Sequence, residues 1–106
     1  MPKFLLIGSY TAEGAKGLIK EGGTGRRAVV QQIVEGLGGT LEAMYFAYGQ
    51  HDAFAILDLA NASDALAISL AANAAGGVHL TTIPLITPEE FDAAAKKSIA
   101  YRPPGA

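Results

Sequence analysis

The side chains best suited to catalysis or metal binding are those of two histidines and one aspartate. His51 and Asp52 are adjacent in the tetrapeptide Gly49-Gln50-His51-Asp52, and His79 lies further along the chain. An imidazole titrates near neutral pH, so beside a carboxylate it can act as a general acid or base, or bind a metal ion. His51, His79 and Asp52 are therefore the candidate catalytic residues.

Structural roles compete with this chemistry. Aspartate commonly bonds backbone N–H groups of its own turn, which would leave His51 as a solvated turn residue. His79 begins an apolar run and could be a residue at a sheet edge or an interface. No His-x-His or His-Glu-x-x-His pattern occurs, and Ser9 has no nearby histidine or acid to activate it. Neither a metal nor a cofactor is predicted.

A glycine-rich stretch with two arginines, residues 22–27, is a candidate anion site. It opens a predicted helix, whose first N–H groups are free, and Arg26 and Arg27 add positive charge. The Gly-Lys-Ser/Thr ending of a phosphate-binding P-loop is absent. The alternative is a flexible connector followed by a charged helix start.

Aromatic residues are the other candidates for binding a small molecule. Tyr10 and Tyr48, with Tyr45 and Phe46, could line a cavity between a sheet and its helices, or could only pack in the core. The candidate ligand-binding residues are Tyr10, Tyr48, Arg26 and Arg27.

The composition limits the class of protein. The chain has 106 residues, half of them apolar, which suits one folded domain and excludes disorder. Only 17% are charged, against about 25% in average soluble domains, so part of the surface is expected to be covered by another chain. The net charge is −2 without a basic stripe, and no apolar run is long enough for a membrane span. With no cysteine, a cytoplasmic protein that binds neither nucleic acid nor membrane is expected.

The order of predicted elements indicates the fold. Strands are expected at residues 3–10, 40–48, 53–59 and 78–86. Helices are expected from Thr11 to 21, at 26–37, from Asn61 or Ser63 to 75, and from Thr87 to 97. This order is the split βαβ arrangement of ferredoxin-like α+β folds, a four-stranded antiparallel sheet covered by helices on one face, with an extra C-terminal helix. Residues 1–98 are expected to form one domain, and 99–106 an extended tail.

Three local features sharpen this outline. Residues 49–52 should form the turn of a hairpin between the second and third strands. The helix ending at 75 is so uniformly apolar that burial on most sides is expected. Pro84 cannot donate to a ladder, so the fourth strand should lie at an edge.

Most predicted strands are apolar on both faces, and this points to a partner. In the first strand, Phe4 and Leu6 lie on one face, and Leu5 and Ile7 on the other. A sheet with one solvated face would alternate apolar and polar residues. We therefore expect a homodimer or higher homo-oligomer through the sheet face, which would form a barrel-like pair.

Three stretches carry a family resemblance: residues 8–14, residues 38–49 together with Asp52, and residues 87–90. Together they resemble the GYD-domain family, small bacterial proteins named for a Gly-Tyr-Asp motif. The resemblance implies a ferredoxin-like domain that pairs into a dimeric α/β barrel, and it implies no established activity. Gly49 and Asp52 match the motif, whereas His51 stands where the family usually has tyrosine.

Two functions follow from these observations. The first is a homo-oligomeric module that binds a small molecule or has a structural or regulatory role. The second, raised by fold analogy, is a cofactor-independent dimeric-barrel enzyme, monooxygenase- or isomerase-like, with His79 or His51 as general base on a small aromatic substrate. The enzyme requires a pocket with an inward-pointing imidazole. A structural module would have that space filled by side chains.

Overall fold

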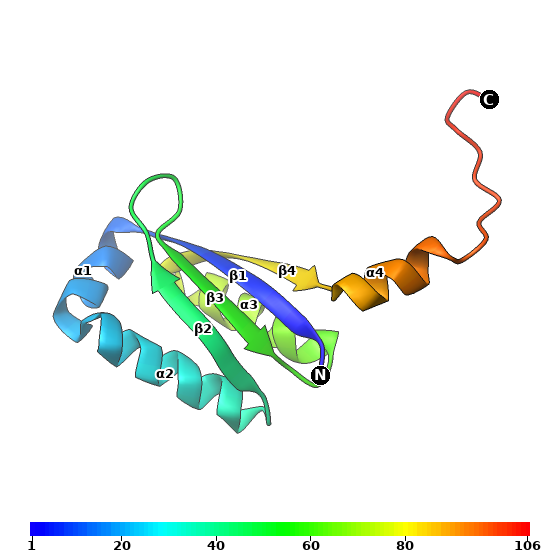
Figure 1. Ribbon diagram of the computed structural model, residues 1–106. Coiled ribbons are helices and arrows are strands. Elements are labelled where there is room, and N and C mark those ends of the chain that lie inside the picture. The colour runs from blue at the N-terminus through cyan, green and yellow to red at the C-terminus, as the bar shows by residue number, and fades with distance from the viewer.

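The computed structural model describes residues 1–106, and its strands and helices follow the predicted order (Figure 1). The strands are β1 (Lys3–Tyr10), β2 (Thr40–Phe46), β3 (Ala53–Asp58) and β4 (Val78–Leu85). The helices are α1 (Ala12–Glu21), α2 (Gly23–Gly36), α3 (Ala62–Ala75) and α4 (Pro88–Ala95). None of the helices has the length and apolar character needed to cross a lipid bilayer.

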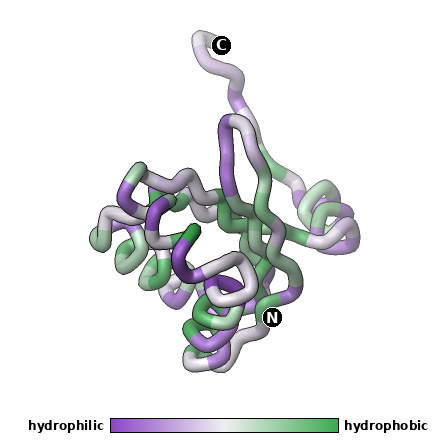
Figure 2. The backbone as a smooth tube through the Cα atoms, turned by 90° about the vertical axis from the view of Figure 1, so that its left-hand side faces the viewer, coloured by the Kyte–Doolittle hydropathy of each residue, from purple (hydrophilic) through white to green (hydrophobic).

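The four strands form one antiparallel sheet in the order β2-β3-β1-β4. This confirms the ferredoxin-like α+β fold. β4 is an edge strand, as Pro84 predicts, because an edge strand can lose a donor on its outer side. The strands are hydrophobic along much of their length (Figure 2).

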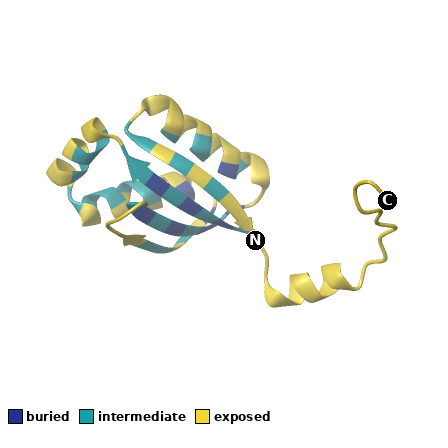
Figure 3. Ribbon diagram, turned by 90° about the horizontal axis from the view of Figure 1, so that it is seen from above, coloured by how far each residue is buried: buried dark blue, intermediate teal, exposed yellow.

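The core lies between the sheet and the helices α2 and α3. Seven residues form its buried cluster: Phe4, Leu6, Val34, Ala55, Leu57, Leu59 and Ala65. No helix covers the opposite side of the sheet, which we call the open face (Figure 3). The open face carries Leu5, Ile7, Phe54, Ile56, His79 and Ile83.

Three helix starts show how local chemistry sets an element's bounds. Thr11 and Asn61 cap α1 and α3 as predicted, each accepting a bond from a backbone N–H in the first turn. α2 begins at Gly23, three residues earlier than predicted. Gly22, at φ 84°, turns the chain in one residue, and its carbonyl oxygen already accepts the N–H of Arg26. A flexible connector is therefore absent, because α1 and α2 are joined at a single glycine.

The β2–β3 connection is longer than the predicted turn. β2 ends at Phe46 rather than at Tyr48, so residues 47–52 form a loop. The N–H of Ala47 donates to the carbonyl of Asp52, and the N–H of Asp52 donates to the carbonyl of Gly8 in β1 (2.8 and 2.9 Å). The end of the loop thus bonds to β1, which a sequence pattern for an isolated hairpin does not reveal.

α3 is less buried than its composition predicts. Only Ala65 is fully buried, whereas Leu66 and Leu70 remain 57% and 62% exposed. The expectation of burial on most sides is wrong for the single chain, since α3 packs on the sheet along one face and no other helix covers its outer side.

α4 begins with the predicted capping box at Thr87 and Glu90, but ends at Ala95 rather than 97. Every residue of α4 and of the tail that follows is exposed, and both project away from the sheet (Figures 1 and 3). The Cα radius of gyration is 16.7 Å, whereas a compact domain of this length has about 13 Å.

Candidate functional site

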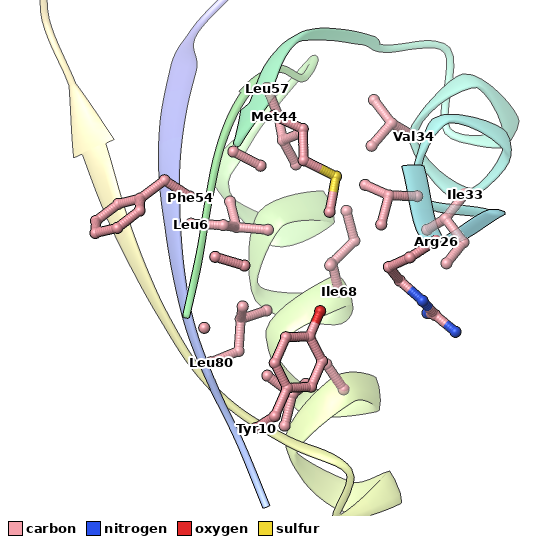
Figure 4. Close-up of a pocket in the computed structure, with 16 residues that line it drawn as sticks. Leu6, Tyr10, Arg26, Ile33, Val34, Met44, Phe54, Leu57, Ile68 and Leu80 are labelled. Carbon is pink, nitrogen blue, oxygen red and sulfur yellow. The ribbon is translucent and has the colours of Figure 1, made fainter. Parts of the chain in front are cut away.

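A cavity of about 140 Å³ lies between the sheet and the helices α2 and α3 (Figure 4). Its wall is apolar except at one end, where Tyr10 and Arg26 contribute the polar groups. β1, β3 and β4 supply one side of the wall, and Val30, Ile33 and Ile68 are among the helix residues on the other. The arrangement can hold an apolar body and contact a polar group at one end.

Tyr10 is the last residue of β1, and its hydroxyl group points into the cavity (Figure 4). Burial raises the pKa of Tyr10 above its ordinary value of 10.0, and the nearby carboxylates of Asp52 and Glu21 raise it too, while Arg26 lowers it. The phenol is therefore neutral at physiological pH, when it can donate one hydrogen bond and accept others.

Asp52 fixes the position of Tyr10. Its Oδ2 accepts the backbone N–H of Tyr10 at 2.8 Å, and its own N–H donates to Gly8 at 2.9 Å. The carboxylate thus bonds to β1, far away in the sequence, rather than to N–H groups of its own turn. Asp52 also lines a second hollow of about 560 Å³, together with Tyr10, Leu18 and Phe46.

Arg26 lies at the opening of the cavity, in the first turns of α2. Its Nε and Nη2 donate to the two carboxylate oxygens of Glu21, the Nη2 bond at 3.0 Å. Beyond this pair lies an outer hollow of about 560 Å³, between α1, α2 and α3. The cavity and the outer hollow are therefore neighbours. They share six wall residues, of which Tyr10 and Arg26 are the polar ones: Tyr10, Arg26, Ile33, Ile68, Ala72 and Val78.

Neither histidine lines the cavity. The ring of His51 lies edge-on to the ring of Phe54, with centroids 6.1 Å apart and planes at 86°. Phe54 points away from the cavity (Figure 4). His79 is exposed on the open face, opposite Ser9 of β1. The cavity therefore has no imidazole base, and no three His, Cys, Asp or Glu side chains gather as a metal site would need.

The two other predicted ligand residues lie elsewhere. Tyr48 is fully exposed in the loop after β2. Arg27 lines a separate hollow of about 310 Å³ beside Tyr45 and Phe46. Of the predicted ligand-binding residues, only Tyr10 and Arg26 are brought together.

Sequence reasoning missed Glu21 and Gly17, which line the outer hollow. Glu21 and Arg26 are separated by a helix junction, so the spacing rules for ion pairs within one helix do not apply to them. Gly17 did leave a signal, because a glycine inside a helical pattern weakens the helix and often has a packing or functional reason.

Comparison with known families gives one match. The family model described as GYD domain matches residues 4–95 of the 106-residue chain. Searches of curated proteins and of solved structures found no match.

Proposed function

The chain belongs to the GYD-domain family, and from this premise we propose that it is a homo-oligomeric module that binds a small, largely apolar molecule. The observation that carries the proposal is the cavity of about 140 Å³ between the sheet and α2 and α3, with Tyr10 at its opening. An interior filled by side chains, without a cavity, would have indicated a structural module instead.

An empty cavity of this kind is costly. At about 24 cal/mol per Å³, a closed cavity of 140 Å³ would correspond to roughly 3 kcal/mol of lost packing free energy, and the opening at Tyr10 and Arg26 makes the cost smaller here. An apolar cavity of about 150 Å³ stays dry and can bind benzene. A ligand of that size would recover much of the lost packing here, so binding is favoured by the same physics that makes the empty cavity unfavourable.

The exposed surface supports self-association. The single chain exposes 7376 Å², whereas a compact monomer of 10.9 kDa would expose about 5,600 Å². A standard interface buries about 800 Å² per partner, so the excess is large enough for a stable dimer. The open face, with Leu5, Ile7 and Phe54, is the surface that a second copy would cover.

α4 contributes to the same excess of exposed surface area. Its Phe91 is 63% exposed, and Ile86 just before it is 61% exposed. Isolated helices shorter than about 12 residues are marginal in water, and the capping box adds only about 1 kcal/mol. We infer that α4 packs against the second copy, since every one of its residues is exposed in the single chain.

Two measurements test the proposal. Light scattering at micromolar concentration should give at least twice the mass of one chain, and a monomer would refute the oligomer. Thermal denaturation with benzene should show a raised midpoint for the wild type. The variant Ala72→Leu, which fills the cavity, should lose this response, whereas Ala74→Leu in the exposed part of α3 should keep it. An unchanged wild-type midpoint would refute the binding function.

The enzyme hypothesis gains no support. It needs a histidine base in the cavity, and both histidines lie outside its wall.

A further inference from the structure

Two hollows of different chemistry share a boundary in which Tyr10 and Arg26 are the polar residues. The inner cavity is apolar and fits about one six-membered carbon ring. The outer hollow is wider, and its polar side chains are Tyr10, Glu21 and Arg26. A molecule that occupies both must be apolar at one end and polar at the other.

The polar end must suit the donors at the junction. A guanidinium has five N–H donors, and Glu21 engages only Nε and Nη2 of Arg26. The remaining donors can bind a further acceptor, and the Arg26 side chain is 36% exposed, so it is accessible. The Tyr10 hydroxyl adds a neutral donor on the cavity side (Figure 4).

Two carboxylates lie near Tyr10 and Arg26, but they do not remove the ability of Arg26 to bind a further acceptor. Glu21 is held on one edge of the guanidinium, which leaves the other edge free. Asp52 is directed at the backbone N–H of Tyr10, and it does not line the inner cavity or the outer hollow.

Gly17 lines the outer hollow without placing a side chain in it. It lies in the middle of α1, where glycine costs about 1 kcal/mol relative to alanine. A Cβ at this position would meet no atom within 4 Å, so no internal contact requires the glycine. Space for a head group is a physical reason for a residue that weakens the helix.

We propose that the ligand is a small monocarboxylate whose apolar body of about six carbon atoms fills the inner cavity, with its carboxylate at Arg26 and Tyr10. The inference rests on the proposed binding function and specifies the class of ligand. Carboxylates match the fork of a guanidinium, and such charge-assisted hydrogen bonds are about twice as strong as neutral ones.

Three probes of nearly equal size test the class: phenylacetate, 2-phenylethanol and 2-phenylethylamine, measured by isothermal titration calorimetry on the full chain. Phenylacetate should bind about tenfold more tightly than the alcohol, the equivalent of one added charge-assisted hydrogen bond. The amine should bind most weakly, since it would face Arg26.

Variants test whether Arg26 is the residue that makes the carboxylate bind more tightly than the alcohol. Arg26→Gln should make phenylacetate and 2-phenylethanol bind equally, and Arg26→Lys should give an intermediate preference because it keeps the charge but loses the fork. Arg27→Gln is the matched control, since Arg27 lies outside both hollows and its loss should change nothing. Gly17→Leu should weaken phenylacetate binding without unfolding the chain, whereas Gly17→Ala should not weaken it.

The outcomes separate the two proposals. If the alcohol or the amine binds as tightly as phenylacetate, the carboxylate class is wrong and the cavity remains a binding site. An unchanged preference in Arg26→Gln would also overturn the class. If none of the probes binds and benzene does not bind either, both the class and the proposed function are wrong.

Discussion

Two glycines in α1 should respond in opposite directions to the same substitution. A Cβ at Gly14 would overlap the carbonyl oxygen of Gly77 and lie 2.6 Å from its carbonyl carbon, whereas at Gly17 it would meet nothing. The same Gly77 carbonyl accepts the N–H of Thr11 at 3.1 Å, which docks α1 against the α3–β4 connection. Gly14→Ala must push these backbones apart, and Gly17→Ala need not move anything.

The magnitudes follow from helix propensity and packing. Gly17→Ala should stabilise the protein by about 0.5–1 kcal/mol, because alanine loses less backbone entropy in a helix. Gly14→Ala gains the same amount but adds an overpacking cost of about 1–3 kcal/mol, and about 1 kcal/mol more if the Thr11 bond breaks. Its net effect should be a loss of up to about 2.5 kcal/mol if the Thr11 bond survives, and of about 1–3.5 kcal/mol if it breaks.

Thermal denaturation followed by circular dichroism measures both effects. At about 4–8 °C per kcal/mol for a domain of this size, Gly17→Ala should raise the midpoint by several degrees and Gly14→Ala should lower it. Both variants must be compared with wild type at one protein concentration, because the stability of an oligomer depends on concentration. Equal shifts of the same sign would show that α1 does not approach Gly77 as described.

Three further predictions concern the loop, the open face and the cavity. Asp52→Ala should lower the free energy of unfolding in urea by about 1.5–3 kcal/mol, because it removes a charged acceptor from the Tyr10 N–H; Asp52→Asn should lose less, and equal losses would contradict this. Leu5→Lys or Ile7→Lys should dissociate or unfold the protein in light scattering, and an unaffected oligomer would rule out the open face as the interface. Burial raises the folded pKa of Tyr10 above 10.0. The contribution of neutral Tyr10 to the free energy of unfolding is therefore complete below pH 10 and is lost as pH rises through the folded pKa. Phenolate absorbance of wild type minus Tyr10→Phe checks this, and titration of Tyr10 at its ordinary pKa would refute it.

Local chemistry made the element order predictable. Thr11, Asn61 and Thr87 each cap the helix that follows, and Thr87 and Glu90 form the complete capping box. These bonds join residues three apart, so the sequence alone contains them. The start of α2 was missed because of the local conformation of Gly22, and the bounds around the β2–β3 loop were missed because distant contacts decide them. The loop at 47–52 bonds to Gly8, and a β-bulge between Leu41 and Ala43 shifts the register of β2 against β3.

The candidate site was predictable by residue but not by geometry. Tyr10 and Arg26 were each candidates for a separate reason, one as an aromatic residue and the other as a helix-start cation. They share a cavity only because α2 packs on the sheet at β2, which brings Arg26 to the same cavity as Tyr10, a long-range arrangement that neither pattern encodes. For the same reason the sequence did not separate Arg26 from Arg27, although only Arg26 lines the cavity.

The motif that marks the family is best explained as a positioning device. Asp52 is the link between the β2–β3 loop and the mouth of the cavity, because its carboxylate holds the backbone of Tyr10. His51, at the position where the resemblance leads us to expect tyrosine, instead packs edge-on against Phe54, on the open face. Neighbouring motif residues therefore serve opposite sides of the sheet. The departure at His51 affects the surface proposed to meet a second copy, while the conformation that presents Tyr10 to a ligand depends on Asp52, which is retained.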